Sequence, residues 1–170
     1  MTGPPDKSEA AAYYFRYIDR VPPGDVVGRL EEQIHQLVSL FQGISEERSL
    51  HRYAPDKWSI RQMVNHVSDT ERLFAFRALW FSRGFQDPLP SFEQDPAVAA
   101  AKADVVPWAR HIEEFRAVRQ ATVAFFRNLP AEAWSRRGVA SGNPVTVRAL
   151  AYIAAGHADH HASVLRERYL

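Results

Sequence analysis

The stretch from Thr146 to Leu165, TVRALAYIAAGHADHHASVL, carries the pattern that decides the fold. Apolar or imidazole side chains recur in it at positions 150, 153, 157, 161 and 164, at intervals of three and four residues, so they share one face of an α-helix. Thr146 suits the N-cap because its hydroxyl can accept a hydrogen bond from a free backbone N–H group. We therefore expect a helix from this residue to the C-terminal end of the sequence, with His157 and His161 on its inward face.

A second helix is predicted to begin at Ser59 and to end near Arg83. Ser59 and Gln62, three residues apart, have the spacing of a capping box, and Trp58 before them suits a hydrophobic staple. Inward positions then follow at intervals of three, four and three residues: Met63, His66, Thr70 and Leu73. His66 is therefore expected to face the interior of the protein.

Two more amphipathic helices complete the pattern. One is expected from the N-cap Asp25 to Gly43, and the other from about 104–107 to a point before Pro130. The connection from 84 to 106 is long and rich in proline, with a short helix predicted over 95–101, and a connection of this length can cross the end of a bundle.

These patterns predict an all-α fold, a four-helix bundle with a long crossover connection between its second and third helices. The simple up-down-up-down order of neighbours is therefore not required. No segment shows a sustained two-residue alternation of β-branched residues, so we expect no sheet.

The length of 170 residues fits one domain, so we expect a single domain over 1–170 with an N-terminal extension over 1–20. Residues 1–9 are polar and rich in proline, and they are expected to be poorly ordered. Residues 10–20 are expected to form a short helical turn or to lie along the bundle.

Charge and composition exclude several functions. Lys and Arg number 21 against 20 Asp and Glu, a net charge of +1 that offers no basic face to nucleic acid. The arginines alternate with acidic residues, a pattern typical of solvated helix faces. The absence of cysteine excludes disulfides, iron–sulfur clusters and a thiol nucleophile of the chain. No apolar run of about 18 residues and no signal-peptide pattern are present, so we expect no membrane span and a cytoplasmic protein.

Three of the seven histidines are predicted to face one another. Two imidazoles four residues apart on a helix, His157 and His161, can both reach one metal ion at about 2.0–2.1 Å. His66 adds a third from another helix. Any one of them could instead be a core residue bonded to a carbonyl group or a tyrosine, but burying three imidazoles requires a partner for each. The sequence therefore predicts that His66, His157 and His161 bind a divalent metal ion.

The other polar residues near these positions receive lesser roles. His160 borders the same helix face, so we expect it to contact substrate or to support a ligand. Glu71 lies about 140° around its helix from His66 and is expected to pair with Arg72, Arg77 or another helix. The remaining histidines are expected to be surface or ordinary helix residues: His35, His51 and His111.

The segment from Trp58 to Arg72, WSIRQMVNHVSDTER, resembles the DinB/YfiT-like superfamily, whose members have a Trp-Ser opening and a His-x-x-x-x-Glu stretch there. The GHADHH segment at 156–161 is similar to the closing histidine motif of that family. With Arg77, the Leu129-Pro130 turn and Trp134, the likeness extends over residues 25–168. The resemblance implies a bundle with a non-simple helix order, a Zn- or Ni-type site at the three histidines, and frequent dimers.

A site with three histidines leaves coordination positions open, whereas structural zinc sites are closed by four protein ligands. An open site can activate water for hydrolysis or hold an external thiol as a nucleophile. The resemblance implies both metal-dependent hydrolases and thiol-dependent S-transferases. The sequence favours transfer of a low-molecular-weight thiol to a small-molecule substrate, because Ala158 follows His157 where a catalytic carboxylate could stand.

Two alternatives stay open. Glu93 or Asp95 in the long connection could supply the base that a hydrolase needs. The third hypothesis is a non-catalytic stress protein that binds a metal or a small ligand.

Overall fold

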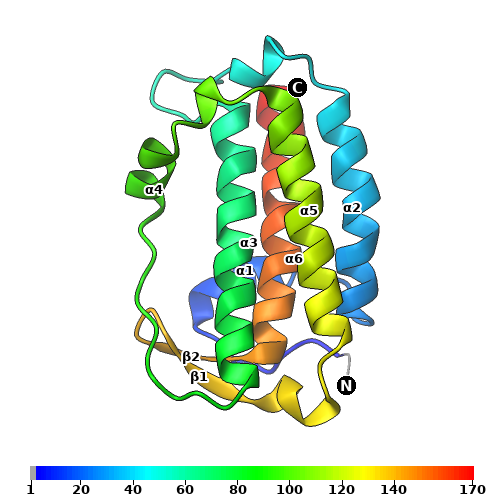
Figure 1. The fold of residues 1–170 in the computed structure, drawn as a ribbon, viewed down its shortest axis with the longest axis vertical. Helices are drawn as coiled ribbons and strands as arrows, with labels where there is room; N and C mark the ends of the chain where they lie inside the picture. Colours follow the sequence, from blue (N-terminus) through cyan, green and yellow to red (C-terminus); the bar gives the residue numbers. More distant parts are fainter. Residues whose placement is uncertain (1–2) are drawn as a thin grey trace.

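The computed structural model describes residues 3–170. Four long helices lie side by side in it as a bundle (Figure 1), which confirms the predicted fold class. Their bounds agree closely with those expected from the sequence: α2 Val26–Gln42, α3 Ile60–Ser82, α5 Trp108–Arg127 and α6 Val147–Val164. A π-helical turn, Leu165–Tyr169, extends α6.

Three of the helix starts are closed by the predicted caps. The Asp25 carboxylate accepts from the backbone N–H of Val27, 3.0 Å away, at the start of α2. At the start of α3, Ser59 and Gln62 form both hydrogen bonds of a capping box. Thr146 accepts from the backbone N–H of Ala149 at 3.0 Å at the start of α6. These caps satisfy backbone donors that the first helical turn leaves free.

The helices do not follow the simple neighbour order. Both α2 and α3 pack against α5 and α6, so helices consecutive in the chain, α2 with α3 and α5 with α6, lie across the diagonal of the bundle. Figure 1 shows that α3 and α5 run in the same direction, because the chain returns along the whole bundle between them. This return is the predicted crossover connection, and it contains the short helix α4, Gln94–Ala101.

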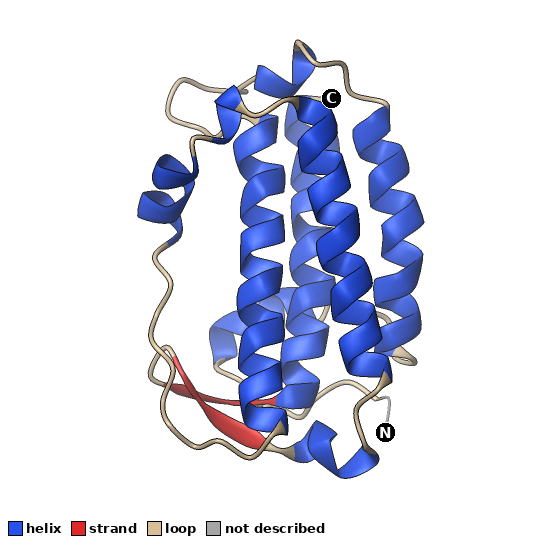
Figure 2. Cartoon of the chain, in the orientation of Figure 1, coloured by secondary structure: helices blue, strands red, loops and turns tan. Residues whose placement is uncertain are grey.

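The expectation of no sheet is wrong. Strands β1, Arg137–Ala140, and β2, Asn143–Thr146, pair antiparallel at one end of the bundle (Figure 2). Ser141 and Gly142 between them have φ angles of 53° and 73°, and two consecutive positive values are typical of a two-residue hairpin turn. The sequences RGVA and NPVT lack a run of β-branched residues, so periodicity did not reveal the strands.

The segment before α2 packs against the bundle. A 3₁₀ helix, Ala12–Tyr14, leads into α1, Phe15–Ile18, which lies against α6 as expected. The two backbones approach so closely that a Cβ atom on Gly156 would lie 2.0 Å from the carbonyl oxygen of Tyr17. This contact explains why a glycine stands in the middle of α6.

The expected disorder of residues 1–9 is wrong for Glu9. Its carbonyl oxygen accepts from the backbone N–H of Thr146 at 3.0 Å, and its carboxylate accepts from the Thr146 hydroxyl at 2.8 Å. Arg148 also pairs with this carboxylate. The backbone hydrogen bond and the ion pair thus tie Glu9 to the start of α6. Residues 1–2 of that expectation lie outside the described residues, and the single-domain organisation stays a prediction.

A buried polar network joins the four helices. Arg119 of α5 donates to both carboxylate oxygens of Glu71 on α3, at 2.7 and 2.9 Å, and it also donates to Gln33 of α2. Gln33 in turn donates to the Ala155 carbonyl oxygen of α6 at 2.9 Å. The predicted pairing of Glu71 with another helix is confirmed. The expectation that arginines lie on solvated faces is wrong for Arg119, which is fully buried because Glu71 neutralises it.

None of the helices described in residues 3–170 has both the length and the apolar composition that crossing a membrane requires.

Candidate metal centre

The structure brings His66 of α3 together with His157 and His161 of α6. The centroid of the His66 ring lies 5.1 Å from each of the other two, which are 4.5 Å apart. One nitrogen atom from each ring can be chosen so that all three lie within 4.8 Å of one another. The inward faces that the three- and four-residue spacings predicted therefore meet at one point.

Thr70, one turn after His66 on α3, fixes the proton on one of these rings. Its hydroxyl donates to the His66 carbonyl oxygen at 2.7 Å, and its oxygen lies 3.4 Å from Nδ1 of His157. Because the hydroxyl proton is committed, the oxygen is an acceptor for Nδ1–H of His157. This tautomer leaves the lone pair on Nε2, which lies 3.2 Å from Nε2 of His161.

Burial keeps all three rings neutral. It lowers the pKa of His66 to about 4, an effect that the charge of Asp95 partly opposes. It also lowers the pKa of His157 and of His161 well below the ordinary value, and the neighbouring imidazoles add to the effect. A neutral imidazole is the form that binds a metal, so the cluster is prepared for one without losing protons at neutral pH.

The donor set fits a divalent cation better than it fits hydrogen bonds alone. One proton shared between the two Nε2 atoms would serve His157 and His161, but Nδ1 of His161 would stay buried without a partner. The His66 ring has no hydrogen bond to any residue in 3–170 either. Nitrogen ligands of a tetrahedral ion at about 2.0–2.1 Å are about 3.3–3.4 Å apart, close to the observed 3.2 Å.

Two hollows reach this cluster from different sides. The smaller, of about 130 Å³, is lined by His66, His157 and Arg77, and we call it the Arg77 hollow. The larger, of about 370 Å³, is lined by His161, His160 and Trp58, and we call it the Trp58 hollow. Gln94 of α4 lines both. The crossover connection therefore lies over the cluster, and small molecules have two approaches to it.

His160, expected to contact substrate or support a ligand, lies outside the cluster of three. It lines the Trp58 hollow, and its ring centroid is 5.1 Å from that of His161 and 5.5 Å from that of Tyr17. These contacts fit either of the two roles expected of it.

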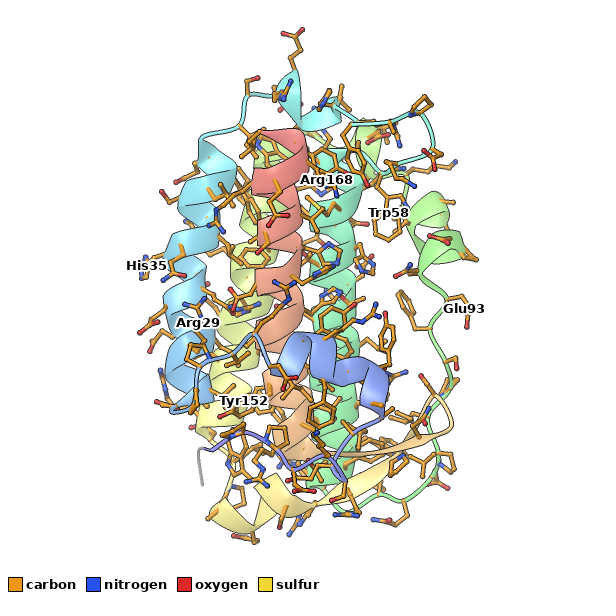
Figure 3. All side chains as sticks on the ribbon, turned by 180° about the vertical axis from the view of Figure 1, so that it is seen from behind. Arg29, His35, Trp58, Glu93, Tyr152 and Arg168 are labelled. Carbon is orange, nitrogen blue, oxygen red and sulfur yellow. The ribbon has the colours of Figure 1, made fainter. Side chains whose placement is uncertain are left out.

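The remaining histidines are apart from the site. His35 is exposed on the outer side of α2 (Figure 3), and His51 is half-buried beside Tyr169. His111 is buried in α5, with Nε2 2.9 Å from the Ala103 carbonyl oxygen, so of the two expected positions it has that of an ordinary helix residue and not that of a surface residue. The chain before α5 folds over this ring, and helical spacing alone does not reveal such a contact.

Some side chains at the site had no role in the sequence-based prediction. Tyr17 of α1 packs its ring edge-on against His157 at 5.1 Å, and Trp58, expected only as a staple, lies 4.8 Å from the His66 ring. Gln94 of the crossover connection lines both hollows (Figure 3 labels its neighbour Glu93). Their positions depend on how α1 and the connection pack, and sequence periodicity carries no signal for that.

The two acidic residues considered as bases differ in position. Asp95 lines the Trp58 hollow together with His161, and its charge acts on His66. Glu93 lines neither of the two hollows. Of the pair, Asp95 is therefore the one near the cluster.

A family model described as the DinB superfamily matches residues 29–165. The chain belongs to the DinB superfamily. Its fold is similar to that of YfiT from Bacillus subtilis, described as a probable metal-dependent hydrolase with an unusual four-helix bundle topology. The TM-score is 0.70 at 14% identity, over 95% of this chain and 91% of YfiT.

A second structure, the DinB-like protein YjoA of Bacillus subtilis, matches with a TM-score of 0.59 at 21% identity, over 83% of this chain and 86% of that one. At these identities the likeness shows the fold that the DinB-superfamily chain shares with both proteins. A search of curated protein sequences finds no match.

Proposed function

We propose that His66, His157 and His161 bind a divalent cation and that this DinB-superfamily protein is a metal-dependent enzyme acting on a small molecule. The observation that carries the proposal is the convergence of three neutral ring nitrogens within 4.8 Å, with no carboxylate or thiol ligand among them. The description of YfiT, which has the same fold, supports it. Three imidazoles suit several metals, and we propose zinc or nickel.

The reaction that we propose is transfer of a low-molecular-weight thiol to a second small molecule. A cation held by three imidazoles keeps coordination positions free and lowers the pKa of a thiol or water bound there. Two hollows of different size reach the cluster, which would give each of two organic molecules its own approach. The larger one, lined by Lys57, Asp56 and His160, offers polar groups to a thiol, and the smaller one would bind the acceptor.

A metal-dependent hydrolase is the second candidate, and the position of Asp95 favours it. Hydrolysis needs a base that accepts a proton from the attacking water, and Asp95 lines the Trp58 hollow beside His161. Asp95→Asn should abolish hydrolysis of an ester or amide if Asp95 is that base, whereas thiol transfer should continue. Dimerisation, expected from the resemblance, stays a prediction that sedimentation of the purified protein would check.

Metal analysis of protein purified without a nickel column tests the site. We expect about one equivalent of metal in the wild type, almost none in His157→Ala or His161→Ala, and a severe loss of affinity in His66→Ala. His35→Ala is the matched control, because His35 is exposed on α2, and it should keep the wild-type content. Equal metal content in all five proteins would contradict the proposed ligands.

Activity is tested on the metal-loaded protein with a panel of bacterial thiols and electrophilic acceptors, and with esters and amides. Thioether products detected by mass spectrometry, together with thermal stabilisation by a thiol only in the loaded protein, would support transfer. Hydrolysis without thiol would support the second candidate. Bound metal without turnover in either assay would contradict both and favour the non-catalytic binding protein.

A further inference from the structure

Arg77 of α3 is a buried cation at the wall of the Arg77 hollow. Only 3% of the residue is exposed. Its Nη2 donates to the Pro90 carbonyl oxygen at 2.8 Å and to the Ser141 hydroxyl oxygen at 3.0 Å, and its Nε is buried without a partner. No carboxylate in residues 3–170 forms an ion pair with it. Both of its acceptors are therefore uncharged oxygen atoms.

Each of the other two deeply buried arginines forms an ion pair with a carboxylate. Arg119 pairs with the Glu71 carboxylate, and Arg61 pairs with the Glu46 carboxylate. Taking a charge out of water is unfavourable unless an opposite charge meets it. A buried guanidinium that lines a hollow and has no carboxylate partner would therefore be stabilised by an anion bound from solution.

The Arg77 hollow follows the axis of α3. His66, Thr70, Leu73 and Arg77 all line it and follow one another at intervals of four, three and four residues, so it runs along one face of α3. Arg77 lies eleven positions after His66, which is about 16 Å along the helix axis. Its other walls are largely aromatic: Tyr13, Tyr14, Tyr17, Phe74 and Phe92. A molecule in the hollow would have an acidic end at Arg77, an apolar body against these rings, and its opposite end at the histidines.

We propose that Arg77 and Ser141 form a carboxylate-binding subsite, and that the substrate in this hollow is an elongated organic acid whose carboxylate lies at the end remote from the histidine cluster. Pro90 and Ser141 accept both protons of Nη2, so a ligand carboxylate would accept a charge-assisted hydrogen bond from Nη1 of Arg77. The Ser141 hydroxyl accepts from Arg77, so its own proton is free for the second ligand oxygen. The substrate class rests on the proposed function, whereas binding of the carboxylate to Arg77 requires no metal.

Calorimetric titration of metal-free protein with benzoate tests the subsite, with the neutral benzamide of similar shape as the matched ligand. We expect benzoate to bind at least tenfold more tightly than benzamide. Arg77→Gln should weaken benzoate binding at least tenfold. Arg83→Gln, which changes an exposed arginine at the end of the same helix, should leave it unchanged.

A second pair of variants leaves the Arg77 side chain in place, in case Arg77→Gln disturbs folding through its contact with Pro90. Ser141 has a φ of 53°, which Asp and Asn tolerate better than other residues except glycine. Ser141→Asp would place a carboxylate against Arg77 and should abolish benzoate binding. Ser141→Asn, equal in size to aspartate but neutral, should weaken benzoate binding because the Ser141 hydroxyl is lost, but it should not abolish binding as Ser141→Asp does.

Several outcomes would contradict the proposed carboxylate-binding subsite. Benzoate binding that survives both Arg77→Gln and Ser141→Asp would do so, as would tighter binding of inorganic phosphate than of benzoate. Benzoate binding only to metal-loaded protein would show that the cation takes the carboxylate, and the proposed function would then stand without the subsite. Conversely, benzoate binding by a protein that takes up no metal would leave the subsite standing and remove the proposed function.

Discussion

The charge state of the three clustered histidines is set by burial, and this gives a pH dependence that can be measured. The pKa of His66 is lowered from 6.5 to about 4 in the folded protein. The unfolded chain therefore binds a proton below about pH 6.5 that the folded chain does not bind. The stability of the metal-free protein should be full above that pH and should fall as the pH drops towards 4.

Urea unfolding of chelator-treated protein between about pH 7 and pH 4 checks this prediction. One pKa unit corresponds to about 1.4 kcal/mol, so His66 alone should remove about 3 kcal/mol by pH 4. His66→Gln should show a shallower fall than the wild type. His35→Gln, at an exposed position, should keep the wild-type slope, and an unchanged slope in His66→Gln would contradict the assignment.

How far single residues can be predicted depends on whether their role is local. The inward direction of His66, His157 and His161 follows from spacing within one helix, and the structure confirms that direction. The burial of Arg119 does not follow from it, because Glu71 lies 48 residues away and only packing brings the two together. That Arg77 has no carboxylate partner among the described residues likewise depends on what packs around it, which no helical pattern encodes.

The contact between α1 and α6 gives a prediction at the scale of elements. Gly156→Ala would place a Cβ atom 2.0 Å from the Tyr17 carbonyl oxygen, and backbone cannot move aside as a side chain can. We expect a loss of about 2–3 kcal/mol in the free energy of unfolding, typical of overpacking, despite the better helix propensity of alanine.

Chemical denaturation of Gly156→Ala and of a matched variant checks this. In Gly28→Ala on α2, the new Cβ atom would approach only the end of the Asp25 side chain, at 2.9 Å. That variant should stay within about 1 kcal/mol of the wild type, since the better helix propensity of alanine offsets the cost of shifting the Asp25 carboxylate, which caps α2. A wild-type stability for Gly156→Ala would show that α1 is not held as tightly as the structure indicates.

Helices could be predicted where residues close together in the sequence specify their ends. Caps such as Ser59 with Gln62 and Thr146 mark helix starts through side-chain hydrogen bonds within a few residues. The β1–β2 hairpin was missed because its turn is specified by backbone conformation at Ser141 and Gly142 and its strands by contact with the bundle. Strands as short as these take their stability from their surroundings.

At the scale of the whole molecule, the site joins α3 to α6, so metal bound there should stabilise the entire fold. A ligand at about 100 times its Kd stabilises a protein by about 2.7 kcal/mol. For a chain of this size, that corresponds to a Tm change of roughly 5–10 °C. We therefore expect a chelator to lower the Tm of the wild-type protein by about this amount.

Thermal melts with and without chelator test this consequence. Restoring zinc should restore the Tm in the wild type and in His35→Ala. His157→Ala should melt at one temperature under both conditions. A chelator effect of the same size in His157→Ala would place the metal elsewhere.

The order of the helices is the part of the fold that the sequence left undetermined. The length of the segment from 84 to 106 permits a crossover, but it does not specify that α3 and α5 run in the same direction. That arrangement depends on which helix faces together bury the most apolar area. This area is a property of the whole bundle and not of any one segment. Because the connection runs back along the bundle, α4 lies over the histidine cluster.

The distance along the chain between the proposed ligands has a consequence for synthesis. His66 precedes His157 by 91 residues, and three of the long helices are translated before α6. A nascent chain therefore displays His66 for much of its elongation with no histidine partner beside it. A metal ion that needs all three histidines could be acquired only after α6 has left the ribosome and docked, so under the proposed function loading would follow folding.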